Sequence, residues 1–117
     1  MEFDSAKERD RWIALKDAED KGIISRLKRQ VTYELIPKIT EPVVVYKKTK
    51  DVVKDKFVQH PLTYTCDFAY MKDGKLVVED VKASPKFIDE TYKVKEKVFR
   101  YKFGFSIRRI YNATDEI

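Results

Sequence analysis

Hydrophobic positions near the start of the chain recur at the three- and four-residue spacing of a helix. Trp12 and Leu15 share a face, and Glu8 lies on that same face at spacings of four and seven. The pattern predicts an amphipathic helix from about Ser5 to Lys21. Gly22 follows it and is typical of a helix end. We therefore expect Glu8 to point toward the core or along its edge.

Strand-type runs fill the middle of the chain, and a second helical pattern follows them. That helix covers about Asp89 to Phe103 and ends before Gly104. The turn Asp73-Gly74 predicts a tight hairpin between two of the strands. The expected strands are Ile24–Ile36, Leu62–Met71, Lys75–Ala83 and Phe105–Tyr111.

The predicted fold is a single α/β domain over residues 1–117, with a central mixed sheet flanked by helices. Its element order is helix, strand, strand, strand, helix, strand, interrupted by a basic insertion at about 38–60. The insertion looks irregular and is bounded by Pro37 and Pro61. Its runs Val43–Tyr46 and Phe57–Val58 could form an extra short hairpin.

Composition supports a globular protein, since 43% of the 117 residues are hydrophobic and 13% are aromatic. No apolar run approaches the roughly 18 residues of a membrane span, and the first residues do not resemble a signal peptide. Cys66 is alone, which excludes an internal disulfide and a thiolate metal site. His60 is also alone, which excludes a histidine-cluster metal site. We expect a cytoplasmic protein with no membrane partner and no small-molecule cofactor.

The charge is concentrated in one part of the chain. The formal net charge is +5, and residues 82–109 contain nine basic residues against three acidic ones. Such a segment indicates a polyanionic partner, of which nucleic acid is the commonest. A solubilising surface is the alternative interpretation.

The Asp73-Gly74 hairpin brings acidic residues together. A two-residue turn places Asp67 directly opposite Asp80, with Lys82 on the same face of the strand as Asp80. Facing carboxylates destabilise a sheet unless a cation compensates them. Lys82 is one candidate for that cation, and a bound divalent metal is the better one. Two carboxylates with water and a phosphate suit Mg²⁺, which could then assist phosphodiester hydrolysis.

Two alternatives to this site remain open at the level of sequence. A three-residue loop would shift the register and place Glu79, not Asp80, opposite Asp67. The acids could also be solvated charges on an edge strand. Glu8 could serve only in a capping box with Ser5, or could contribute to the site as well.

Several motifs together resemble the PD-(D/E)XK signature of restriction-endonuclease-like nucleases. The segment from Tyr64 to Phe68 contains the first acid, and Glu79-Asp80-Val81-Lys82 follows after the glycine turn. Phe3 to Glu8 resembles the first-helix acidic motif of that superfamily. Tyr33 to Pro37, preceded by Gln30, resembles a group of small phage and prophage proteins within it. The resemblance covers residues 3 to about 110, with Cys66 in place of the signature proline.

The resemblance implies a fold, an activity and a ligand set. It implies a restriction-endonuclease-like core and an endodeoxyribonuclease that depends on Mg²⁺, for which Mn²⁺ may substitute. The implied metal ligands are Asp67, Asp80 and the backbone carbonyl of Val81, with Glu8 as a further ligand and Lys82 as a catalytic residue.

The resemblance also implies a setting, because phage members of the superfamily include Holliday-junction resolvases. We therefore expect a homodimer that acts on branched DNA in phage replication or recombination, in the host cytoplasm if the protein is phage-encoded. A nuclease for ordinary duplex or single-stranded DNA is an alternative. A catalytically inactive nucleic-acid-binding module is another.

Two groups of basic residues are candidates for binding DNA. On the second helix, Lys93, Lys97 and Arg100 recur at spacings of four and seven and form one stripe. In the insertion, the candidates are Lys47, Lys48 and Lys50. Because the insertion also has an apolar run, we expect it to serve as an arm in dimerisation or in DNA binding.

Overall fold

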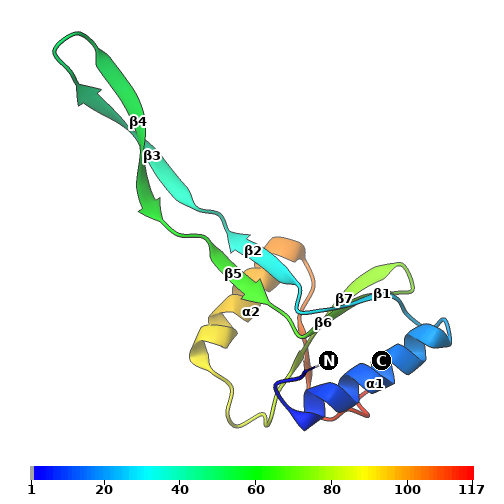
Figure 1. The fold of residues 1–117 in the computed structure, drawn as a ribbon. Helices are drawn as coiled ribbons and strands as arrows, with labels where there is room; N and C mark the ends of the chain where they lie inside the picture. Colours follow the sequence, from blue (N-terminus) through cyan, green and yellow to red (C-terminus); the bar gives the residue numbers. More distant parts are fainter. Residues whose placement is uncertain (1) are drawn as a thin grey trace.

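The computed structural model describes residues 2–117 as two helices, a four-stranded central sheet and a long two-stranded ribbon (Figure 1). The molecule measures 68 × 33 × 30 Å, and the ribbon accounts for its length. Neither helix in this part of the chain is long and apolar enough to cross a membrane.

Both helices begin and end where the sequence predicts. Helix α1 covers Ala6–Asp20, and the Ser5 hydroxyl accepts a hydrogen bond from the Glu8 backbone N–H at 3.1 Å. Helix α2 covers Glu90–Phe103 and ends at Gly104, which has a φ of +80°. A left-handed residue lets the chain leave the helix sharply, and glycine adopts it without strain.

The central sheet is mixed, as predicted. Its strand order is β1 (Ser25–Arg29), β6 (Phe68–Lys72), β7 (Lys75–Val81) and β8 (Arg108–Ile110). Neighbouring strands are antiparallel except for the parallel pair β7 and β8. The turn at Asp73-Gly74 sets the predicted register, which runs from the pair Lys72 and Lys75 to the pair Phe68 and Glu79.

Side chains alternate between two cores on opposite faces of the sheet. Phe68, Tyr70 and Val77 pack with Leu15 of α1. Ala69 and Val78 pack with α2 residues such as Tyr92 and Phe99. Each helix therefore covers one face, and consecutive residues of β7 point into different environments.

Two predicted strands are each broken into two. Residues 24–36 divide at Gln30, whose φ of +51° ends β1 before β2 (Thr32–Ile36). Residues 62–71 divide at Cys66 and Asp67, between β5 (Leu62–Thr65) and β6. Strands β2 and β5 pair with each other in a separate sheet. With two further strands in the insertion, residues 2–117 have eight strands rather than the predicted four, although the coarse order of helices and strands persists.

The basic insertion is more regular than predicted. Strands β3 (Ile39–Tyr46) and β4 (Asp51–Gln59) pair along their whole length as an antiparallel ribbon. The ribbon continues the direction of β2 and β5 and extends away from the body (Figure 1). We call it the β3–β4 arm. At the other end of the chain, the predicted strand Phe105–Tyr111 is shorter, because only Arg108–Ile110 pair.

Candidate functional site

One pocket collects the five residues that were predicted to hold the metal or to act in catalysis. It lies where the start of α1 meets the ends of β6 and β7, and its volume is about 440 Å³. We call it the carboxylate pocket. Its lining residues are Asp4, Ser5, Lys7, Glu8, Asp67, Asp80, Val81, Lys82 and Ala83.

Asp80 is buried at the end of β7, on the face that α2 covers. The Tyr64 hydroxyl donates a hydrogen bond to Asp80 Oδ2 at 2.6 Å, and Lys82 Nζ lies 2.8 Å from Asp80 Oδ1. The Lys82 ammonium also lies over the Tyr92 ring, 3.5 Å from its centroid. Two tyrosines that we did not predict as site residues therefore position the predicted pair.

Asp67 occupies the bend between β5 and β6. The β6–β7 ladder ends at Phe68 and Glu79, so the prediction that Asp67 directly opposes Asp80 as a ladder partner is wrong. Its carboxylate Oδ2 instead accepts the Val81 backbone N–H at 2.7 Å. Burial, together with the nearby negative charges of Asp80 and Glu8, raises the pKa of Asp67 to about 7.

Glu8 points into the protein, as its helical spacing predicts. It is 3% exposed, and its Oε1 atom accepts no hydrogen bond. The nearest cation is Arg29, whose guanidinium lies 3.9 Å from that oxygen. Burial, followed by repulsion from Asp4, raises the pKa of Glu8. A buried carboxylate oxygen without a partner is costly, so this position favours a cation.

The donor set fits Mg²⁺ in its chemistry. Glu8, Asp67 and Asp80 supply hard carboxylate oxygens. Val81 adds a carbonyl that points to the same side of β7 as its N–H, toward Asp67. Within residues 2–117, no three acidic, histidine or cysteine side chains converge closely enough to hold a metal by themselves. Mg²⁺ usually retains several waters and needs only one or two carboxylates together with a substrate phosphate.

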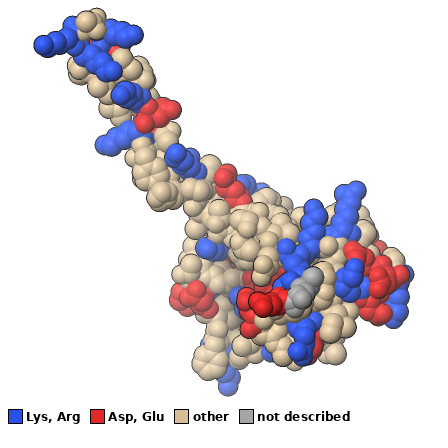
Figure 2. All heavy atoms as spheres, viewed as in Figure 1, with Lys and Arg blue, Asp and Glu red and all other residues tan. Residues whose placement is uncertain are grey.

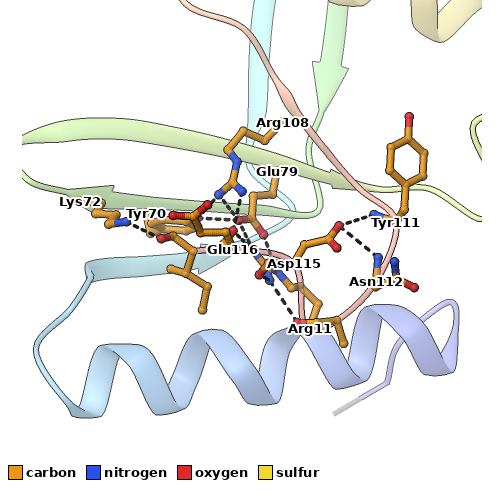
Figure 3. A network of polar contacts seen from close by, with 11 residues as sticks. Arg11, Tyr70, Lys72, Glu79, Arg108, Tyr111, Asn112, Asp115 and Glu116 are labelled. Carbon is orange, nitrogen blue, oxygen red and sulfur yellow. Dashed lines mark hydrogen bonds and ion pairs between the residues drawn. The ribbon is translucent and has the colours of Figure 1, made fainter.

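Glu79, the alternative second acid, lies on the opposite face of β7 and is excluded from the pocket. Its carboxylate forms two hydrogen bonds with the Arg11 guanidinium, at 2.8 and 2.7 Å, and both side chains are fully buried (Figure 3). Tyr70 donates to the same carboxylate, and Arg108 lies 3.4 Å away. We call these four side chains the Glu79 network. The register alternative is therefore wrong.

The predicted basic residues lie outside the carboxylate pocket. On α2, Lys93 pairs with Glu90 at 3.0 Å and Arg100 donates to the Gly104 carbonyl at 2.7 Å, whereas Lys97 is exposed. Lys47, Lys48 and Lys50 lie at the tip of the arm, where Figure 2 shows basic side chains gathered. The structure thus places the two basic groups on separate parts of the surface.

Other positioning residues come from the start of α1 and from β1. Lys7 Nζ donates to the carbonyls of Lys82 and Ala83, at 3.4 and 3.2 Å, and so ties α1 to the end of β7. The Arg29 guanidinium lies over the Phe3 ring, 4.0 Å from its centroid. The only sequence signal for Lys7 is its place in the first-helix motif beside Glu8.

Comparison with known proteins identifies a family. The model of DUF1064, which is described as a protein of unknown function, matches residues 1–113. No curated protein matches the chain. No solved structure matches it either.

Proposed function

The chain belongs to the DUF1064 family, and we propose that it is a Mg²⁺-dependent endodeoxyribonuclease of the PD-(D/E)XK type. The carboxylate pocket carries this proposal. Glu8, Asp67 and Asp80 come from separate parts of the chain and line one pocket, together with Asp4 and the lysines Lys7 and Lys82. Lys82 lies closest to the acids, 2.8 Å from Asp80. This arrangement has an excess of negative charge that a divalent cation would balance.

The order of elements adds support. When the β3–β4 arm is set aside and the breaks at Gln30 and Asp67 are bridged, the order is helix, strand, strand, strand, helix, strand. The acids also lie at the positions that the PD-(D/E)XK resemblance implies, on the first helix and around the second and third strands. We therefore assign the domain to the restriction-endonuclease-like core as part of this proposal.

Each side chain has a separate task in the proposed reaction. A bound Mg²⁺ would polarise the scissile phosphate and lower the pKa of a coordinated water. Asp67 and Asp80, with the Val81 carbonyl, would hold the metal, and Glu8 would bind it directly or through water. Lys82 would orient the attacking water or stabilise charge on the phosphate. Tyr64 and Tyr92 would keep Asp80 and Lys82 in position.

Branched DNA, including Holliday junctions, is the proposed substrate class. Residues 2–117 form one body with a projecting arm, an arrangement better suited to recognising DNA shape than a base sequence. Lysines at the arm tip, with Lys93 and Arg100 of the α2 stripe, would contact phosphates, which position a duplex without reading its sequence.

A cleavage assay tests the proposal. The protein is incubated with Mg²⁺ and a panel of four-way, flap, duplex and single-stranded DNAs. Asp80→Asn should lower turnover by roughly a hundredfold or more, as loss of an active-site electrostatic group does. EDTA should abolish cleavage, and the exposed-site control Glu90→Gln should cleave normally. Cleavage by Asp80→Asn at the wild-type rate, or in EDTA, would overturn the proposal.

A second assay separates chemistry from binding. Lys82→Ala should retain most of the DNA affinity and lose turnover. Reversing Lys93 and Arg100 of the α2 stripe to glutamate should weaken binding and flatten its salt dependence, because fewer counterions are released. DNA binding without cleavage of any substrate would favour the inactive binding module instead.

A further inference from the structure

The β3–β4 arm has two unlike faces. Directly paired residues of an antiparallel ladder share a face, and the faces alternate along each strand. The register pairs Val44 with Val53 and Tyr46 with Asp51, so these four side chains lie on one side. We call this side the acidic apolar face. Its members are Thr40, Pro42, Val44, Tyr46, Asp51, Val53, Asp55 and Phe57.

The acidic apolar face is open to solvent. Tyr46 is 81% exposed, Val53 is 68% exposed, and Val44 and Phe57 are each 46% exposed. Its charged members, Asp51 and Asp55, are both acidic, whereas Lys54 and Lys56 lie on the opposite face. A contiguous exposed apolar patch of this kind marks a surface that another molecule covers.

A second exposed apolar surface lies at the base of the arm, between α2 and β2. It is a groove of about 670 Å³, lined by Leu35, Ile36, Lys97, Val98, Tyr101 and Lys102. We call it the α2–β2 groove. Its charged residues are both lysines, and Lys102 Nζ is anchored on the Glu34 carbonyl at 2.5 Å. Tyr101 is 92% exposed.

These two surfaces are complementary, and we propose that they join two copies of the chain. The acidic apolar face of one arm lies in the α2–β2 groove of its partner. Val44, Val53 and Tyr46 would cover the apolar floor, while the aspartates of the arm pair with Lys97 and Lys102. Apolar contact provides the association, and the opposite charges select the orientation.

The groove cannot be filled by the arm of the same chain. The arm begins at Ile39, three residues after groove residue Ile36, and runs away from the body (Figure 1). Its apolar side chains therefore lie at a distance from their own groove. Reciprocal exchange between two copies buries both surfaces on both chains and closes with two-fold symmetry.

A charge swap tests the pairing with the full chain. One variant carries Asp51→Lys and Asp55→Lys, and the other carries Lys97→Glu and Lys102→Glu. Each alone opposes like charges at the interface, so each should sediment as a monomer at loading concentrations where the wild type is a dimer. An equimolar mixture has opposite charges at both contacts and should regain a species of twice the monomer mass.

One variant on each face of the arm completes the design. Val53→Asp should abolish the dimer, while Lys54→Asp, one residue along the same strand, should leave it intact. Circular dichroism establishes that each variant is folded. A wild type that is monomeric at every concentration, or a dimer that survives both charge changes, would overturn the proposal. A monomeric wild type whose DNA binding is lost in Val53→Asp would assign the face to nucleic acid. The readout is mass, so its outcome does not depend on whether the protein cuts DNA.

Discussion

Glu79 and Asp80 are neighbours on β7, yet the balance of positive and negative charge around their carboxylates differs. Glu79 meets the fully buried Arg11 guanidinium, the Tyr70 hydroxyl and the nearby Arg108. Asp80 shares the carboxylate pocket with three further acids, Asp4, Glu8 and Asp67, and Lys82 lies 2.8 Å from it. The negative charge of Glu79 is compensated by two arginines of the protein itself. Asp80 belongs to a cluster of acids in which one carboxylate oxygen, Glu8 Oε1, accepts no hydrogen bond.

This contrast separates a structural acid from a candidate catalytic one. The buried ion pair between Arg11 and Glu79 joins α1 to the sheet. The Glu79 carboxylate already accepts hydrogen bonds from Arg11 and Tyr70, which leaves it little capacity to bind a ligand. In the carboxylate pocket, burial and the neighbouring negative charges raise the pKa of Asp67 and of Glu8, and such a cluster favours the binding of a cation. Burial alone would not distinguish them, since Glu79 and Asp80 are both buried.

Breaking the Glu79 network should produce the largest effect. Arg11→Met leaves the Glu79 carboxylate buried without its main partner, so the free energy of unfolding should fall by about 3–5 kcal/mol. Chemical denaturation measures the change. The double variant Arg11→Met with Glu79→Leu should recover much of the loss, because no buried charge is left unpaired. A single variant as stable as the wild type would mean that the network contributes little.

Adding Mg²⁺ should stabilise the protein through the carboxylate pocket and not through the Glu79 network. A ligand that binds only the folded state, present at 100 times its Kd, raises the free energy of unfolding by about 2.7 kcal/mol. Thermal melts should shift upward with Mg²⁺ or Mn²⁺, and Asp67→Asn should abolish the shift. The control Glu90→Gln, at an exposed carboxylate, should keep it. An equal shift in all three proteins would indicate nonspecific binding.

Stability should depend on pH through Asp67. Its pKa rises from an ordinary value near 4 to about 7 in the fold. The folded state therefore binds the proton more tightly, and stability falls as pH rises from about 4 to 7. After allowance for solvent screening, the loss should be on the order of 2 kcal/mol. Asp67→Asn should remove this part of the pH dependence, and urea denaturation at several pH values measures it.

The smallest expected effects come from removing the hydroxyl groups of Tyr64 and Tyr70. Tyr64→Phe removes the hydrogen bond to Asp80, and Tyr70→Phe removes the one to Glu79. Each change should cost about 1 kcal/mol of stability. Only Tyr64→Phe should also lower turnover and shift the pH–rate profile, because only Tyr64 contacts a candidate catalytic acid. Equal turnover in both variants would assign Tyr64 a purely structural role.

Local signals were sufficient for the helices and for the hairpin that holds Asp80 and Lys82. A serine cap, two glycine stops and the Asp73-Gly74 turn each act within a few residues. The turn determines the register of β6 and β7, so the ladder from Lys72 to Phe68 was predictable. Pairing also explains the extended arm, which periodicity alone had suggested only as a short hairpin.

Long-range packing decided the breaks in the strands and the partners of the acids. The left-handed turn at Gln30 lets the chain leave the central sheet for the β2–β5 pair, and no glycine marks that position. The contact between Arg11 and Glu79 joins residues 68 positions apart. Tyr64 reaches Asp80 from a strand in another sheet.

The sequence by itself determined where the helices end, how the Asp73-Gly74 hairpin pairs and which acidic and basic residues are candidates, because these depend on neighbours within a few residues. Only the tertiary structure decided that Asp80 belongs to the pocket while Glu79 is neutralised by Arg11. It also decided that Asp67 leaves the ladder and binds the Val81 N–H. The physical reason is that the protonation and partners of a buried charge depend on every group that surrounds it in space.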